Sequence, residues 1–141
     1  MIRVILAVYL LTMAAPAAAN SVATDAINAL RAAKNRAPIK YSRTLEAAAI
    51  AHANDMARKR FFSHKGSDGS NVSHRVSAQG YRWCFVAENI AKGQRNLAEV
   101  MRAWKNSPGH RKNMLNKSAT EFAVIGVNPN IWVMVLANPK C

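Results

Sequence analysis

The chain has 141 residues, half of them apolar, and carries 20 lysines and arginines against 7 acidic residues, a formal charge of +13. This length supports one domain with a sizeable core and excludes two domains of ordinary size. The charge predicts attraction to polyanions and anionic surfaces, but no helix-turn-helix, zinc-finger or RNA-binding signature accompanies it, so we expect no specific nucleic-acid recognition.

Residues 1–19 have the pattern of a cleaved secretory signal. Arg3 forms a short positive region, residues 4–13 are uncharged and mostly apolar, and residues 17–19 are three alanines before Asn20. We predict a signal peptide over 1–19 and one domain over 20–141, exported to the periplasm or the extracellular space. The alternative is an uncleaved anchor, which the apolar run is too short to support because a membrane span needs roughly 20 residues.

Helical patterns dominate the first half of the chain. Residues 22–30 predict a short amphipathic helix that ends before Pro38. Ser42 is placed to cap a second helix whose apolar face also carries His52, a position that favours a core histidine over a ligand. Residues 65–71 are rich in glycine and serine and predict an irregular loop, followed by a short helix over 72–79 that Gly80 closes.

Two further helices are predicted around a Ser-Pro-Gly-His motif. Residues 97–104 carry an apolar stripe that Asn96 can cap. Ser107 is expected to cap the next helix with its hydroxyl, and Pro108 suits the first helical position. His110 then lies on the first turn, where the helix dipole disfavours the protonated imidazole.

Three stretches predict strands. Residues 81–90 are rich in aromatic and β-favouring types and contain Glu88, a carboxylate that is costly to bury unless a positive or hydrogen-bonding group meets it. Residues 120–127 and 131–137 are apolar runs joined by a hairpin signal, and the second is continuous enough to be a central strand covered on both faces. Together these elements predict an α+β fold with an antiparallel sheet covered by helices.

The two cysteines, Cys84 and Cys141, predict one disulfide bond, because an even number in an exported chain most simply forms one bridge. Two free thiols or an intermolecular pair are the alternatives.

Standard catalytic signatures such as HExxH, GxSxG and the P-loop are absent from the sequence. What remains is a nonlocal group of His64, Glu88 and His110. Two imidazoles and one carboxylate suit zinc with an open fourth position, or another divalent ion. Glu121, at the start of a strand, is a further candidate for the same site.

Several segments carry a resemblance to a known family. In chain order they are Phe62-Ser63-His64, Asp68-Gly69, Arg75, Gly80-Tyr81, the Ala-Glu-Asn-Ile-Ala stretch 87–91, the stretch 104–115 with its Trp and Ser-Pro-Gly-His-Arg pieces, and residues 121–127. This pattern resembles the SCP domain of the CAP superfamily (cysteine-rich secretory proteins, antigen 5 and pathogenesis-related proteins of class 1), in its compact bacterial form. The resemblance covers nearly all of the chain after the signal.

The resemblance implies an α-β-α sandwich with helices on both faces of the sheet. It also implies that His64 and His110 face one cleft with Glu88, where some family members bind a divalent metal. The eukaryotic pattern often has a second acid at the position of Ser107, so this chain departs from a site with two acids, with Glu121 as a candidate substitute.

Family members are reported as lipid or sterol binders, as signalling or defence proteins and occasionally as proteases, so membership does not settle function. Our leading hypothesis is a secreted, monomeric and non-enzymatic binding module with a polar, metal-capable cleft and a cationic surface. Its expected partners are lipids or anionic envelope components, with peripheral membrane contact. The alternative is a hydrolase in which Glu88 or a histidine activates water, on a metal or without one, or in which Ser107 is the nucleophile. A structural envelope protein held by charge alone is a third hypothesis.

Overall fold

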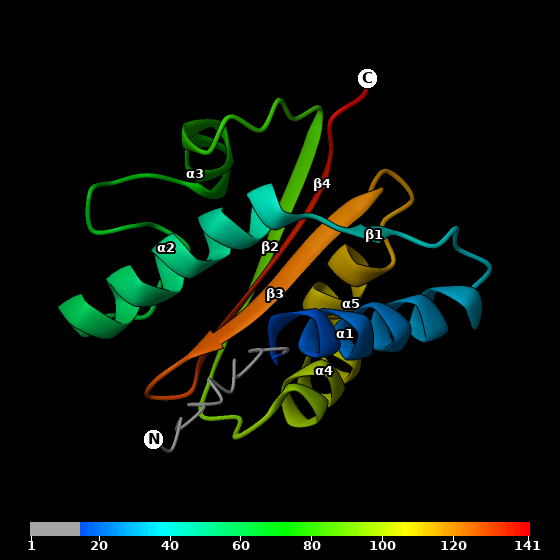
Figure 1. Cartoon of the computed structure of the whole chain (residues 1–141), viewed down its shortest axis with the longest axis horizontal. Coiled ribbons are helices and arrows are strands. Elements are labelled where there is room, and N and C mark those ends of the chain that lie inside the picture. Colours follow the sequence, from blue (N-terminus) through cyan, green and yellow to red (C-terminus); the bar gives the residue numbers. More distant parts are fainter. Residues whose placement is uncertain (1–14) are drawn as a thin grey trace, which may run out of the picture.

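The computed structural model describes residues 15–141, which form five helices and four strands (Figure 1). The helices are α1 (Ala15–Ala32), α2 (Arg43–Lys59), α3 (Val72–Ala78), α4 (Leu97–Asn106) and α5 (Pro108–Met114). The strands are β1 (Lys40–Tyr41), β2 (Phe85–Lys92), β3 (Glu121–Val127) and β4 (Ile131–Asn138). Residues 1–14 of the predicted signal peptide lie outside the described residues, and cleavage before Asn20 stays a prediction. None of the described helices is both long and apolar enough to cross a bilayer.

The strands form one sheet in the order β1-β3-β4-β2. β4 is a central strand, antiparallel to β3 and to β2, so that Val135 lies opposite both Ala123 and Glu88. β1 adds a two-residue parallel pair at the start of β3, with Lys40 opposite Glu121. The predicted antiparallel sheet with a central last strand is confirmed, and a short parallel pair at one edge is added to it.

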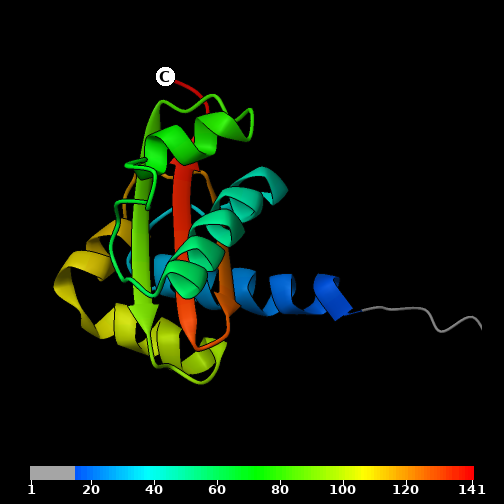
Figure 2. The ribbon, with the colours of Figure 1, turned by 90° about the vertical axis from the view of Figure 1, so that its left-hand side faces the viewer.

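Helices cover both faces of this sheet (Figures 1 and 2). α2 and α3 lie on one face, over a core built from the apolar stripe of α2 and side chains such as Val133 and Val135. α1, α4 and α5 lie on the other face, over a core that contains Trp104 and Phe122. The predicted α+β class and α-β-α sandwich are confirmed.

Local signals set most of the helix boundaries. The Ser42 hydroxyl accepts a hydrogen bond from the Leu45 N–H at 3.4 Å, and the Asn96 side chain accepts one from the Glu99 N–H at 2.9 Å, so both predicted N-caps are confirmed. β2 begins later than the predicted strand, because the Tyr81 N–H closes the end of α3 by donating to the Val76 carbonyl at 3.1 Å.

A buried arginine attaches α1 to the rest of its layer. Arg31 is 1% exposed, and its guanidinium donates to the carbonyl groups of Ala37 and Met114 at 2.8 Å each and of Asn116 at 3.1 Å. The last two carbonyls lie at and just after the C-terminus of α5, where backbone acceptors have no partner within the helix. Arg31 therefore satisfies the end of α5 while it fixes the position of α1.

Candidate functional site

A buried carboxylate is the centre of the candidate site. Glu88 lies on β2 with its side chain 3% exposed, and its Oε1 accepts a hydrogen bond from His64 Nδ1 at 2.8 Å. Its Oε2 accepts one from Arg75 Nη2 at 2.7 Å. The expectation that a positive group meets this carboxylate is confirmed, because Arg75 offsets the cost of burying the charge.

Arg75 also fixes the loop that carries His64. Its guanidinium donates to the Ser70 carbonyl at 2.9 Å and to the His64 carbonyl at 3.1 Å. Arg75 lies on the last turn of α3 and is 9% exposed. One arginine thus holds the carboxylate, the irregular loop and the backbone of the histidine that contacts the carboxylate.

His52 supports the same segment from α2. It is 1% exposed, and its Nε2 donates to the Ser63 carbonyl at 2.9 Å, directly before His64. The same nitrogen lies 3.9 Å from Glu88 Oε1. Burial lowers the pKa of His52, which favours the neutral ring. His52 is therefore a core residue, as expected, that also braces the site.

The His64 side chain itself is exposed, at 60%. Because Nδ1 is engaged by Glu88, the nitrogen left for a ligand is Nε2. The residue lines a cavity of about 480 Å³ together with Lys65, Gly69 and Val72.

His110 is paired with Ser107 rather than with Glu88. Its Nδ1 lies 2.9 Å from the Ser107 hydroxyl. Ser107 occupies the N-cap position of α5, and Pro108 follows it at the start of the helix, as predicted. The expected capping bond is wrong, however, because the Ser107 side chain makes no hydrogen bond to the helix backbone and is used by the imidazole instead.

Burial and the nearby His64 lower the pKa of His110, so a neutral imidazole is favoured there. The sequence predicted the same direction of the pKa shift but attributed it to the helix dipole, whereas the causes in the structure are burial and His64. His110 and Ser107 line a cavity of about 300 Å³ together with Phe62, Lys92 and Trp104, whose lining shares no residue with that of the cavity beside His64.

Two asparagines join the halves of the site. Asn89, fully buried on β2 beside Glu88, donates to the His110 carbonyl at 3.1 Å. The Asn113 side chain of α5 donates to Asn89 Oδ1 at 2.8 Å. These bonds fix α5 against β2. Sequence reasoning did not assign a site role to Arg75, Asn89 or Asn113, although the need of Glu88 for a positive partner was a signal that a cation had to lie nearby.

Glu121 has a different partner. It lies at the first position of β3 and accepts a hydrogen bond from the Tyr81 hydroxyl at 2.6 Å. Burial, followed by this contact with Glu121, raises the pKa of Tyr81. The structure thus brings His64 to Glu88 and His110 to Ser107, and places Glu121 with Tyr81.

The side chains around Glu88 offer few free donors to a metal ion. Within residues 15–141, no group of three or more His, Cys, Asp or Glu side chains is placed to hold an ion. Both oxygens of Glu88 are engaged, by His64 and Arg75. In metal sites, ligating histidines commonly donate their other N–H to a carboxylate. Glu88 is such a carboxylate for His64, because it accepts the hydrogen bond from Nδ1. Among the described residues, no hydrogen bond engages the Nε2 atom of His64 or of His110, and the three-residue metal site stays a prediction.

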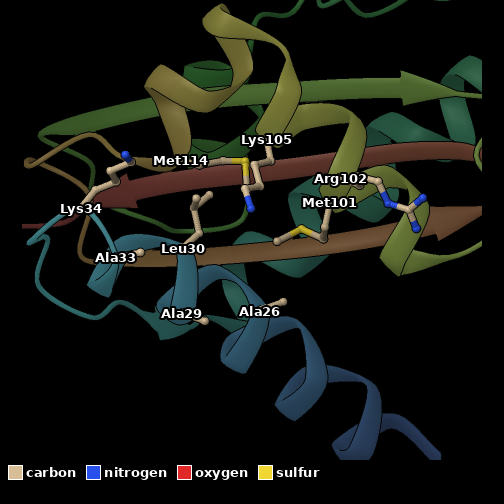
Figure 3. A pocket seen from close by; sticks show the side chains of 9 residues that line it. All are labelled: Ala26, Ala29, Leu30, Ala33, Lys34, Met101, Arg102, Lys105 and Met114. Atoms are coloured by element: carbon tan, nitrogen blue, oxygen red, sulfur yellow. The ribbon is translucent and has the colours of Figure 1, made fainter.

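A second candidate site is an apolar groove of about 580 Å³ within the layer formed by α1, α4 and α5 (Figure 3). It is lined by Ala26, Ala29, Leu30, Ala33, Lys34, Met101, Arg102, Lys105 and Met114. Its walls are α1 on one side and α4 and α5 on the other. In Figure 3 the Lys105 and Met114 side chains reach toward Leu30, while Lys34 and Arg102 lie at opposite ends.

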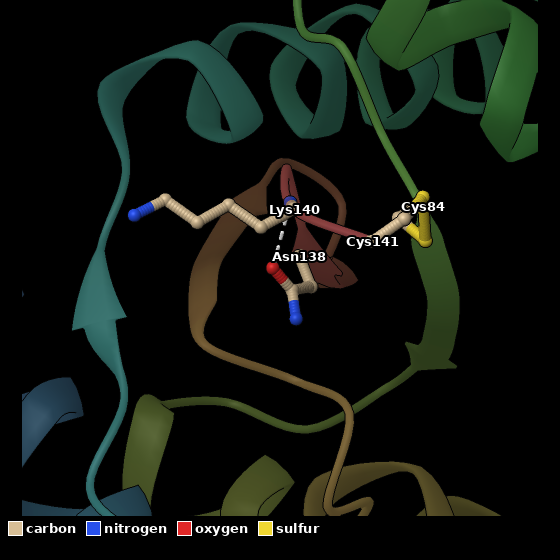
Figure 4. The surroundings of a disulfide bond; sticks show 4 residues. All are labelled: Cys84, Asn138, Lys140 and Cys141. Atoms are coloured by element: carbon tan, nitrogen blue, oxygen red, sulfur yellow. Dashed lines mark hydrogen bonds between the residues drawn. A yellow bond between two sulfur atoms is a disulfide. The ribbon is translucent and has the colours of Figure 1, made fainter.

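The disulfide between Cys84 and Cys141 is present, as predicted (Figure 4). It joins the segment before β2 to the last residue of the chain. In addition, the Cys84 N–H donates to the Asn138 carbonyl at 2.7 Å, and the Asn138 side chain accepts from the Lys140 N–H at 2.9 Å. The C-terminal end is therefore held beside β2, the strand that carries Glu88.

The three-layer sandwich, with helices on both faces of the sheet, is the fold that the sequence resemblance implied. A family model described as the cysteine-rich secretory protein family, CAP, matches residues 24–128. The chain belongs to this family.

Two relatives come from Bacillus subtilis (strain 168). The uncharacterized protein YkwD is 37% identical over 106 residues, which are 74% of this chain and 41% of YkwD. The uncharacterized membrane protein YlbC is 27% identical over 100 residues, which are 71% of this chain and 29% of YlbC. The chain thus spans less than half of the length of either relative.

Solved structures of extracellular and outer-surface proteins share the fold. An extracellular protein containing an SCP domain from Bacillus anthracis str. Ames superposes with a TM-score of 0.80 at 25% identity, over 86% of this chain and 41% of that chain. An outer surface protein from Borrelia burgdorferi superposes with a TM-score of 0.75 at 23% identity, over 85% of this chain and 92% of that chain.

Proposed function

We propose that this CAP domain is a secreted binding module that takes an anionic amphiphile of the cell envelope, an acyl chain with an acidic headgroup, in the groove between α1 and α4. The observation that carries this proposal is the composition of the groove. Most of its lining is apolar and includes Leu30, Met101 and Met114, while the charged residues that line it are three cations, among them Lys105 beside Met114, and no acid (Figure 3). Its volume of about 580 Å³ lies within the range of small-molecule sites.

The charge balance of the whole surface supports an anionic partner. Among residues 15–141, the ion pairs between a lysine or arginine and an acid are Arg43–Glu46, Arg75–Glu88 and Arg95–Glu99. Most of the lysines and arginines among these residues therefore have no acid within ion-pair distance. Such a surface attracts anionic envelope components and adds peripheral contact with an anionic membrane.

We propose that the protein acts outside the cytosol. The signal pattern over residues 1–19 and the disulfide both suit an oxidising compartment. The extracellular and outer-surface proteins with the same fold support the proposal further.

Calorimetric titration with a long-chain fatty acid tests the groove. Ala29 is exposed and lines the groove, so Ala29→Trp fills it without entering the core, and we expect binding to be lost. Ala32→Trp is the matched control, because Ala32 is exposed on the same helix and does not line the groove. Equal binding by both variants would place the ligand elsewhere.

A second candidate function is metal-dependent chemistry at His64 and His110. The observation in its favour is that the Nδ1 atom of each ring is engaged by the protein, by Glu88 and Ser107 respectively, which leaves Nε2 for an ion. A bound divalent ion would supply Lewis acidity there. The contact between Ser107 and His110 also supports the alternative of a hydrolase with Ser107 as nucleophile, because a nearby imidazole can activate a serine hydroxyl.

A further inference from the structure

One edge of the sheet is only partly covered. β3 runs from Glu121 to Val127, but β1 pairs with its first two residues alone. In the described part of the chain, no strand continues along this edge beyond Phe122. Figure 1 shows the edge from the front, between α2 on one side and α1 on the other.

The hydrogen bonds to β1 identify which backbone groups face outward. The Lys40 N–H donates to the Thr120 carbonyl at 3.0 Å, and the Ser42 N–H donates to the Phe122 carbonyl at 2.8 Å. Because the direction of backbone groups alternates along a strand, Val124 and Gly126 direct their N–H and C=O groups to the same edge, where Gly126 is exposed and Val124 is 7% exposed. The Val124 carbonyl accepts a long hydrogen bond from the Tyr41 hydroxyl, at 3.4 Å, which agrees with this direction.

A hollow of about 350 Å³ lies along these residues. Its lining is Asn20, Ala23, Tyr41, Glu46, Leu97, Val124, Ile125, Gly126 and Trp132. Gly126 is exposed, and a Cβ atom there would come within 2.8 Å of the Trp132 ring, so the strand offers bare backbone over an aromatic floor. Such a surface combines an open hydrogen-bonding edge with space for an apolar side chain.

The charge of the chain favours an acidic partner over a second copy of the chain at this edge. A second copy of the chain carries the same formal charge of +13 and is repelled at low salt. The acid in the lining, Glu46, is neutralised by Arg43 at 2.9 Å, while Lys40 next to the edge is exposed and has no acid within ion-pair distance among the described residues. An acidic segment of a partner protein is therefore attracted electrostatically to this edge.

We propose that the open edge of β3, from Val124 to Val127, accepts an extended acidic segment of a partner protein as an added strand, with one apolar side chain of that segment in the hollow beside Trp132. The lining of this hollow shares no residue with the groove between α1 and α4 or with the cavities beside the histidines, so the proposal goes beyond the function proposed above. Backbone hydrogen bonds supply affinity in such complexes, and the side-chain pocket supplies specificity.

The test uses a synthetic peptide that alternates glutamate with leucine and is blocked at both ends. Amide hydrogen exchange, followed residue by residue by NMR, reports on the edge directly. We expect exchange of the Val124 and Gly126 amides to slow by about tenfold or more when the peptide is added, since both become hydrogen-bonded. Two control peptides, one with lysine in place of glutamate and one with proline in place of every second residue, are expected not to bind.

Two variants fill the hollow from different elements, so that a folding defect in one does not decide the test. Leu97→Trp and Asn20→Trp should each weaken peptide binding by about tenfold. Val22→Trp is the control, because Val22 is 59% exposed on the same helix as Asn20 and does not line the hollow. Unchanged exchange at the two amides, or equal binding of the lysine or proline peptide, would overturn the proposal. Protection that rises with protein concentration alone would overturn it in favour of a second copy.

Discussion

Replacing Arg75 by methionine should destabilise the protein far more than an ordinary surface change. The guanidinium is 2.7 Å from Glu88 Oε2, and the two side chains are 9% and 3% exposed. Methionine fills similar space but leaves the carboxylate buried with His64 as its remaining hydrogen-bond partner at short distance. Removing one member of a buried ion pair costs about 3–5 kcal/mol, because the other charge remains desolvated.

For a domain of this size, that loss corresponds to a fall in the melting temperature of about 10–20 °C. Urea unfolding followed by circular dichroism measures the free energy, and a thermal melt measures the temperature shift. The double variant Arg75→Met with Glu88→Gln removes the buried charge as well, so it should recover most of the lost stability.

A loss below about 1 kcal/mol in the single variant would refute the reasoning, since it would mean that solvent reaches Glu88. Equal losses in the single and double variants would refute it in another way. In that case the bonds of Arg75 to the backbone at Ser70 and His64, and not its charge, would carry the stability.

Three further predictions concern protonation, metal and salt. Burial lowers the pKa of His52, so the unfolded chain binds more protons there than the folded protein, and stability should fall as the pH drops below about 6.5. His52→Gln should reduce this part of the pH dependence in urea titrations at pH values on either side of about 6.5. In calorimetric zinc titrations, His64→Ala and His110→Ala should each abolish zinc binding. Glu88→Gln should weaken it by about 10–100-fold, because Glu88 orients a ligand. Complete loss of zinc binding in Glu88→Gln would instead make Glu88 a ligand. Binding to anionic vesicles should weaken steeply as salt is raised, and retention that does not change with salt would show that apolar contacts dominate.

The sequence was sufficient to predict the architecture because its signals are local. The Ser42 and Asn96 caps, the apolar stripe of α4 and the continuous apolar run of β4 each depend on residues close in the chain. The disulfide was also predictable, since Cys84 and Cys141 had no competing partners.

The candidate site was harder to predict because its contacts are nonlocal. The Ser107 hydroxyl had two acceptable partners, a backbone N–H of α5 and the His110 ring, and only the folded position of the ring decides between them. Glu121 was a further candidate for the site, but Tyr81, forty residues away in the chain, engages it. Likewise, nothing local indicated that Asn89 would tie His110 to the strand of Glu88.

The attachment of α1 has a consequence for maturation of the protein. The described side chains that hold this helix in its layer, Ala23, Ile27 and Arg31, recur at every fourth residue and form one stripe. All three lie after position 19, so a peptidase that cuts before Asn20 would shorten the helix without removing any of them. Such a cut would therefore leave the docking stripe of α1 in place, whether it comes before or after folding.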